Sequence, residues 1–152
     1  MSLPRLDPQP LSALPKAVLE MFPAPPIALF QNAANLFAVM DSATALRAFV
    51  PDFAAMAVLG ETGLVITARG EPDSSADFLS RSFAPGVGIP EDPVTGSTHS
   101  TLLPYWAKIL GKERLQAYQA SRRGGWIGCD LTPDRVVLTG AAVTYLTGEI
   151  TV

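Results

Sequence analysis

The sequence predicts an α+β fold in which mostly antiparallel strands form a β-barrel-like roll around one central helix. Strand-like segments lie on both sides of a single long apolar helix at about residues 97–110. Strands and helices do not alternate in the way that indicates a parallel, doubly wound sheet. With 152 residues and 48% hydrophobic residues, the chain has the size of one domain and ample material for a core.

Residues 1–26 are interpreted as a proline-rich lead-in segment. Its helix candidate is "LSALPKAVLEMF", in which Leu14, Val18 and Leu19 recur near helical spacing. Residues 1–3 are interpreted as a start or cloning remnant that takes no part in the fold. The packed lobe is therefore expected to cover residues 27–152.

The lobe begins with strand and helix candidates in turn. Residues 27–40 carry strand-forming Ile, Phe and Val around an Asn-rich kink, which predicts two short strands or one bulged strand. Ser42 is a candidate N-cap for a helix that Pro51 ends. Asp52 similarly caps a second short helix, which Gly60 terminates.

Further strands are predicted over residues 63–69, 77–84 and 114–151. The second of these alternates between two faces, with Phe78, Ser80 and Ser82 on one and Leu79, Arg81 and Phe83 on the other. Arg81 is expected to pair with a nearby carboxylate. Arg122-Arg123-Gly124-Gly125 is expected to form a hairpin turn, or else to ring the mouth of a cleft.

Composition excludes several classes of function. The net charge is −3, and the densest basic spot is Arg122–Arg123, too small for a nucleic-acid-binding surface. The single cysteine, Cys129, and the single histidine exclude an internal disulfide and leave too few soft ligands for a structural zinc site. Cys129 is expected to be a small buried hydrophobic residue.

The longest apolar stretch, "PPIALFQNAANLFAVM", is interrupted by Gln31, Asn32 and Asn35, so it does not predict a membrane span. The N-terminus lacks a basic segment followed by an uninterrupted apolar region, so no signal peptide is expected. We therefore expect a cytoplasmic protein with no membrane partner.

Polar residues are concentrated in "EDPVTGSTHSTLLPYWAKIL", directly before the central helix. Gly96 permits a tight turn with positive φ, and Ser97 or Thr95 can cap the helix. The unpaired N–H groups at the start of such a helix attract an anion, and a carboxylate substrate is the simplest guest. Asp92 is then either a turn or capping acid, or a functional acid at a cleft; Ser97 is either an N-cap or a functional hydroxyl.

The helix itself is expected to be buried through Leu102, Leu103, Trp106 and Leu110, together with Ile109. Pro104 removes one backbone donor, which predicts a kink or some accommodation in the helix wall. His99 points about 200° away from Ser97 on this helix, so the two cannot form a catalytic dyad. The segment also lacks the G-x-S-x-G elbow of hydrolases and the lysine of a phosphate-binding loop.

The chain from about residue 28 onward resembles the C-terminal half of the PhzF-like phenazine biosynthesis family. The resemblance rests on "DFLSRSFAPGVGIPEDPVTGSTHSTLLPYWAKILGK", "LQAYQASRRGG" and "RVVLTGAAVTYLTGEI". It implies the diaminopimelate epimerase fold, with two similar lobes and an active site between them. It also implies cofactor- and metal-independent isomerase chemistry, in which a proton moves on a small carboxylate such as dihydro-hydroxyanthranilate.

By this resemblance Asp92 matches the catalytic aspartate of the C-terminal lobe, and Ser97 the serine beside the substrate. These two are the expected catalytic residues, and Thr95, Gly96, Thr98 and His99 are expected to bind the substrate. Gly96 and the helix start, with Thr95, match the anion-binding turn, and His99 matches the histidine of the motif. Thr98 stands where alanine is commoner, and Ser100 where cysteine is common. The family's glutamate base and a further histidine belong to an N-terminal lobe that has no counterpart in this sequence.

Two functions follow as alternatives. The chain is half of an isomerase whose site forms between lobes, or it is a non-catalytic small-anion-binding or interaction module. In either case the expected partners are a small carboxylate and either an N-terminal lobe or a second copy, which would form a homodimer.

Overall fold

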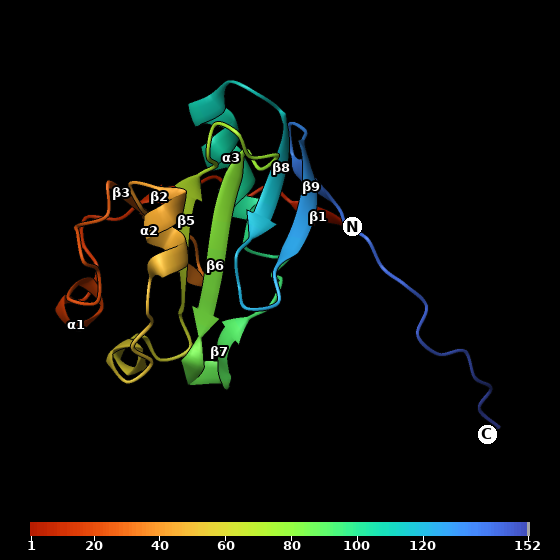
Figure 1. Ribbon diagram of the computed structural model, residues 1–152, viewed down its shortest axis with the longest axis horizontal. Helices are drawn as coiled ribbons and strands as arrows, with labels where there is room; N and C mark the ends of the chain where they lie inside the picture. Colours follow the sequence, from red (N-terminus) through yellow and green to blue (C-terminus); the bar gives the residue numbers. More distant parts are fainter. Residues whose placement is uncertain (152) are drawn as a thin grey trace.

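The computed structural model describes residues 1–151, and it confirms the predicted α+β class (Figure 1). The strands are β1 (Ser2–Pro4), β2 (Gln9–Pro10), β3 (Ala28–Gln31), β4 (Asn35–Val39), β5 (Gly63–Arg69), β6 (Phe78–Ala84), β7 (Ile89–Asp92), β8 (Arg114–Gln119), β9 (Gly125–Leu131) and β10 (Arg135–Thr139). The helices are α1 (Lys16–Leu19), α2 (Ala43–Ala48) and α3 (His99–Leu110), with 3-10 turns η1 (Ala55–Leu59) and η2 (Pro85–Val87).

All the strands belong to one sheet, with the order β1-β10-β9-β8-β6-β5-β4-β3-β2 and with β7 paired to β6. Two neighbouring pairs are parallel, β4 with β5 and β6 with β8. The other pairs are antiparallel, as predicted. The two parallel pairs arise because α2 and α3 lie in the connections that return the chain to the same end of the sheet.

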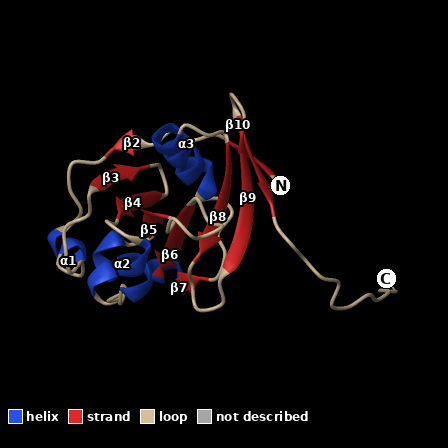
Figure 2. Ribbon diagram, turned by 45° about the horizontal axis from the view of Figure 1, so that its top comes forward, coloured by secondary structure: helices blue, strands red, loops and turns tan. Residues whose placement is uncertain are grey.

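The sheet curls around α3 (Figure 2). Its two outer strands, β1 and β2, are joined by residues 5–8 alone. Five Cα steps reach at most about 18 Å, so the two edges of the sheet must lie near one another. Residues 5–8 are hydrogen-bonded to the β9–β10 turn and to α3. Arg5 N–H donates to the Asp134 carbonyl, and Leu6 N–H donates to the Ser100 carbonyl.

Pro104 does not break α3, which runs continuously from His99 to Leu110. A proline lacks the N–H that would bond the carbonyl four residues earlier, here that of Ser100. That free carbonyl accepts the Leu6 N–H at 2.9 Å. The link between β1 and β2 therefore satisfies the group that Pro104 leaves open, and it holds the helix inside the curled sheet.

One core lies between α3 and the concave face of the sheet. It contains Phe37, Val65, Phe78, Leu102, Leu103, Trp106, Ile127, Cys129 and Leu138. Trp106 Nε1–H donates to Thr67 Oγ1 at 2.9 Å, so the indole nitrogen is not left unpaired in the core. Ile109 is 53% exposed, so its expected place in the apolar stripe is wrong; the stripe is narrower than the sequence suggested.

A second core lies on the other face, where α1, α2 and η1 cover the sheet. It contains Leu14, Val18, Phe22, Leu46, Phe49, Met56, Leu64, Ile66, Leu79 and Phe83. The predicted alternation in β6 is confirmed, because Leu79 and Phe83 enter this core whereas Phe78 enters the first. The cap predicted at Ser42 is present, since its hydroxyl accepts from Ala45 N–H. Asp52 accepts from the N–H groups of Ala54 and Ala55, but the element that follows is the 3-10 turn η1, whose N-cap is Ala54 without a side-chain bond.

Two expectations about the ends of the fold are wrong. Residues 2–4 form β1 and pair with β10, so they are part of the sheet. The strand predicted to reach residue 151 ends at Thr139, and residues 140–151 are exposed and without regular structure. The pattern of the latter segment is strand-like, but no strand of the described chain pairs with it. Val152 lies outside the described residues.

Candidate functional site

Asp92 is the last residue of β7, beside the buried strand β6, where Ser82 is its register partner. The preceding residue, Glu91, binds Arg81 of β6 through Nε at 2.7 Å and Nη2 at 3.2 Å. The expectation that Arg81 pairs with a carboxylate is therefore confirmed. This bidentate pair fixes β7 and thereby the backbone that carries Asp92.

The carboxylate of Asp92 is tied to the turn that follows it. Thr95 Oγ1 donates to Asp92 Oδ2 at 2.7 Å. Gln119, at the end of β8, bonds both ends of this turn, because its Nε2 donates to the Asp92 carbonyl at 2.8 Å and its Oε1 accepts the Thr95 N–H at 2.7 Å. Residues 92–95 thus form a hydrogen-bonded loop on a rigid base.

The chain then enters α3 through one turn at residues 96–98. Within the part of the chain that the structure describes, the backbone N–H groups of Gly96, Ser97 and Thr98 have no acceptor. Three adjacent free donors at the positive end of a helix are able to bind an anion, such as a carboxylate. Gly96 does not adopt the positive φ that we expected. A Cβ at this position would lie 3.3 Å from Cε of Met1, the flexible end of a side chain that can shift, so this contact does not require glycine.

Neither predicted side-chain cap of α3 is present. The N-cap is Thr98, and no side-chain hydrogen bond caps the helix. Ser97 is exposed, which leaves its hydroxyl open to solvent. Thr98 is buried, and its Oγ1 donates to the Thr95 carbonyl at 3.2 Å. Thr98 therefore contributes its backbone N–H, and not its hydroxyl, to the group of free donors.

His99 lies in the core, with an exposed fraction of 0%. Its Nδ1 lies 2.7 Å from the Thr95 carbonyl, which can only accept, so Nδ1 carries the proton. Burial lowers the pKa of His99 to about 4, although the bond to Thr95 opposes the shift. The neutral ring therefore stabilises the turn from the buried side, through its hydrogen bond to the Thr95 carbonyl. The expected contact of His99 with a substrate stays a prediction, because in this conformation no part of the side chain is exposed.

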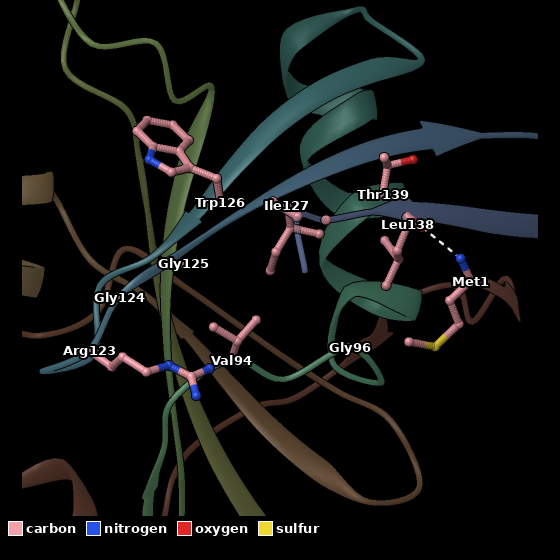
Figure 3. A pocket seen from close by; sticks show the side chains of 12 residues that line it. Met1, Val94, Gly96, Arg123, Gly124, Gly125, Trp126, Ile127, Leu138 and Thr139 are labelled. Carbon is pink, nitrogen blue, oxygen red and sulfur yellow. Dashed lines mark hydrogen bonds between the residues drawn. The ribbon is translucent and has the colours of Figure 1, made fainter. Parts of the chain in front are cut away.

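A groove of about 690 Å³ opens beside the helix start (Figure 3). Val94, Ile127 and Leu138 line its apolar wall, Met1 lies at one end, and Arg123 and Trp126 lie at the other. Gly125 lets this wall form, because a Cβ there would lie 2.3 Å from Cγ2 of Val94. The groove includes Gly96 but none of the other predicted site residues.

A second groove of about 660 Å³ is lined by Phe53, Pro90, Glu91, Pro93, Ser121, Arg122 and Arg123. Arg123 thus borders both grooves, and the turn at residues 120–124 between β8 and β9 confirms the predicted hairpin. Asp92 lines neither groove. The cleft that we expected at the helix start is therefore only a half-open surface in this chain.

Cys129 is 1% exposed, as expected, and burial raises the pKa of its thiol to about 12. Residues 1–151 hold no group of three or more His, Cys, Asp or Glu side chains that could bind a metal ion. None of the described helices has the length and hydrophobicity needed to cross a bilayer.

The sequence profile of a family described as "Phenazine biosynthesis-like protein" matches residues 3–148. The chain belongs to this phenazine biosynthesis-like, or PhzF, family. An uncharacterized isomerase of Pseudomonas aeruginosa is 46% identical over 126 residues, which are 83% of this chain and 47% of that protein. A second uncharacterized isomerase of that organism is 41% identical over 150 residues, 99% of this chain and 56% of that protein.

Solved structures agree with the PhzF assignment. A PhzF family protein from Enterococcus faecalis superimposes with a TM-score of 0.87 at 33% identity, covering 100% of this chain and 57% of that one. A PhzC/PhzF protein from Clostridium difficile gives a TM-score of 0.85 at 33% identity, again covering 100% and 57%. The chain thus spans about half the length of the PhzF relatives that it matches.

The residue that sequence reasoning missed is Gln119. It lies 24 positions beyond Thr95, and nothing in its local sequence links it to the turn. Its signal was indirect: a polar amide at a position whose neighbours two residues apart, Leu115 and Ala117, face the core. A buried amide must find partners, so this pattern could have marked Gln119 as part of a polar network.

Proposed function

We propose that this chain is the half of a PhzF-type isomerase that carries Asp92, and that Asp92 moves a proton on a small carboxylate substrate. The supporting observation is that two groups lie within seven residues of each other: the Asp92 carboxylate, held by Thr95, and the three free N–H donors of Gly96–Thr98. The first group can accept or donate a proton, and the second can hold the substrate's carboxylate. Ser97, exposed beside these donors, is proposed to contact the substrate.

A proton transfer of this kind needs a second acid or base on the opposite side of the substrate. The two open grooves, one lined by Gly96 and the other by Glu91 and Pro93 next to Asp92, support a site that is completed by another lobe. On closure, exclusion of water would strengthen the bonds between the free N–H groups and a carboxylate. The complete site would thus consist of Asp92 and the helix start on one wall and a second proton carrier on the other.

The partner that covers this surface is proposed to be a complementary lobe or a second copy of this chain. Residues 140–151 support association, since Val143, Tyr145 and Ile150 are each at least 90% exposed. Apolar surface of this extent usually finds a partner. The segment has the composition of a strand, and a strand gains stability by pairing with another edge.

The test joins this chain to the remaining residues of the 41% identical Pseudomonas aeruginosa isomerase. The chimera is incubated in D₂O with a panel of small unsaturated carboxylates, and deuterium uptake into each compound is followed by NMR. Uptake that disappears in Asp92→Asn supports the isomerase. Uptake that persists in Asp92→Asn removes Asp92 from the proton transfer.

The alternative is a non-catalytic module that binds small anions at the same helix start. It is distinguished by titrating the chain alone with the same carboxylates and following its amide resonances. Binding that shifts Gly96, Ser97 and Thr98, with no deuterium uptake in the chimera, favours the module. If those three resonances do not move with any carboxylate, both functions lose their anion site.

A further inference from the structure

Gln119 is completely buried, with an exposed fraction of 0%. Its amide bonds three atoms: the Asp92 carbonyl, the Thr95 N–H and Thr95 Oγ1. All three belong to the turn that carries the candidate proton donor. A buried amide without partners is costly, so these bonds hold the Gln119 side chain in place. The same bonds also fix the conformation of the turn.

The orientation of this amide is fixed by backbone chemistry. Its Oε1 faces the Thr95 N–H at 2.7 Å, and a backbone N–H can only donate. Its Nε2 faces the Asp92 carbonyl at 2.8 Å, and a carbonyl can only accept. A rotated amide would oppose donor to donor and acceptor to acceptor, so it is excluded.

The fixed amide then sets the direction of the next bond. Nε2 directs its second hydrogen at Thr95 Oγ1, 3.1 Å away. The Thr95 hydroxyl therefore accepts from Gln119, and its own single proton is donated to Asp92 Oδ2 at 2.7 Å. Hydrogen bonds run one way from Gln119 through Thr95 to Asp92, and such chains strengthen each member.

We propose that Gln119 is a positioning residue for Asp92, acting through the Thr95 hydroxyl. Oδ2 is occupied as an acceptor, whereas Oδ1 has no donor among residues 1–151. Oδ1 is therefore the oxygen that exchanges a proton with the substrate. This role rests on the proposed function of Asp92, but the one-way chain of bonds can be tested without any substrate.

The test measures the ¹³Cγ chemical shift of Asp92 by NMR in the full chain at pH 7. In Gln119→Glu, the new carboxylate can still accept the Thr95 N–H but cannot donate to Oγ1. The Thr95 hydroxyl then turns toward it, and Asp92 Oδ2 loses its donor. We expect the Asp92 resonance to move in Gln119→Glu and in Thr95→Val, and the double variant to show no further change, because both act in series.

Two controls isolate the effect. Gln116→Glu adds the same charge to the same strand, three residues away, at a side chain that does not bond the turn; it should leave the Asp92 resonance at its wild-type value. Thr95→Ser keeps the hydroxyl and should also keep that value. An unchanged Asp92 resonance in folded Gln119→Glu overturns the proposal. If that variant does not fold, Gln119→Met, which keeps the apolar volume but has no amide to donate to Oγ1, takes its place, and an unchanged Asp92 resonance in it overturns the proposal.

In the chimera, Gln119→Glu is expected to lower kcat for deuterium uptake with little change in KM, because the amide touches Asp92's turn and not the substrate. A purely structural role would instead lower both active fraction and stability, leaving kcat per folded molecule unchanged. If Asp92→Asn keeps full uptake while the resonances still respond in series, the proposed function fails and the hydrogen-bond chain stands.

Discussion

Arg81 and Glu91 join two strands of the sheet to the end of α2, one residue before Asp92. Arg81 lies in β6 with an exposed fraction of 8%, and two of its nitrogens bind the Glu91 carboxylate. Its third nitrogen, Nη1, donates to the Phe49 carbonyl at 2.6 Å and the Leu46 carbonyl at 3.3 Å. The end of α2, the central sheet and the strand that carries Asp92 are therefore joined through one guanidinium group.

Glu91→Gln should lower the free energy of unfolding by about 3 kcal/mol, because it leaves a buried cation without its counter-ion. Urea denaturation followed by circular dichroism measures the change. Glu20→Gln is the matched control, since its partner Lys16 is exposed and the pair lies 3.7 Å apart on a helix surface; it should produce no measurable change. Equal stability of Glu91→Gln and wild type would show that the Arg81 charge is solvated.

Asp92→Asn should reduce deuterium uptake in the chimera by about 10²-fold or more, the usual contribution of a positioned acid or base. The amide oxygen can still accept from Thr95, so the turn should remain folded. Ser97→Ala should cost less and act chiefly on KM, because the exposed Ser97 hydroxyl is proposed to contact the substrate and not to transfer the proton. Circular dichroism of both variants controls for folding, and an equal loss in the two would contradict the separate roles.

His99 should make the protein sensitive to acid. Its pKa lies at about 4 when folded and at 6.5 when exposed, so only the unfolded chain binds its proton between these values. The contribution is complete above pH 6.5 and is lost as the pH falls toward 4, at roughly 1.4 kcal/mol per pH unit and about 3 kcal/mol in all.

The measurement is the unfolding free energy of wild type and His99→Gln at several pH values. The difference between them should shrink as the pH falls from 6.5 to 4. This is the chain's single histidine, so its Hε1 resonance also reports the titration directly. A midpoint near 6.5 in the folded protein would contradict a buried neutral ring.

Cys129 should be inert toward thiol reagents in the folded protein. Only a thiolate reacts, and burial both raises the pKa of this thiol to about 12 and blocks access. Labelling with Ellman's reagent at pH 8 should be far slower than in urea, where the thiol is exposed. Fast labelling without denaturant would show that β9 opens readily.

The chain alone should self-associate without isomerase activity. Light scattering should report a species larger than 16.1 kDa, the mass of one chain. Removal of residues 141–152 should weaken the association, because it removes the exposed apolar side chains of that segment. A monodisperse monomer would contradict the association, and deuterium uptake by this chain alone would contradict the need for a second lobe.

Local patterns predicted most of the elements. The cap at Ser42, the alternation in β6 and the apolar face of α3 follow from nearest neighbours, so they could be predicted directly. The strand at residues 2–4 could not, because its stability depends on β10, far away in the sequence. The segment 140–151 failed for the opposite reason: its strand-forming composition has no partner in the described chain.

The site divides in the same way. Asp92 and the start of α3 follow from a contiguous motif, so their closeness was predictable from spacing alone. The roles of Thr95 and Thr98 within the turn depend on side-chain directions that spacing does not determine. Gln119 reaches the turn from another strand, and only the parallel pairing of β6 with β8 brings it there.

The pairing of β1 with β10 also constrains how the protein is made. The Met1 amino group donates to the Leu138 carbonyl, 137 positions along the chain, and Ser2 pairs with Val137. A ribosome adds about 5–20 residues per second, so β1 must remain unpaired for several seconds until β10 has emerged from the exit tunnel. The sheet therefore closes only after residues 135–139 have left the tunnel. Until then, the edge of β9 that later pairs with β10 should be open to chaperones and proteases.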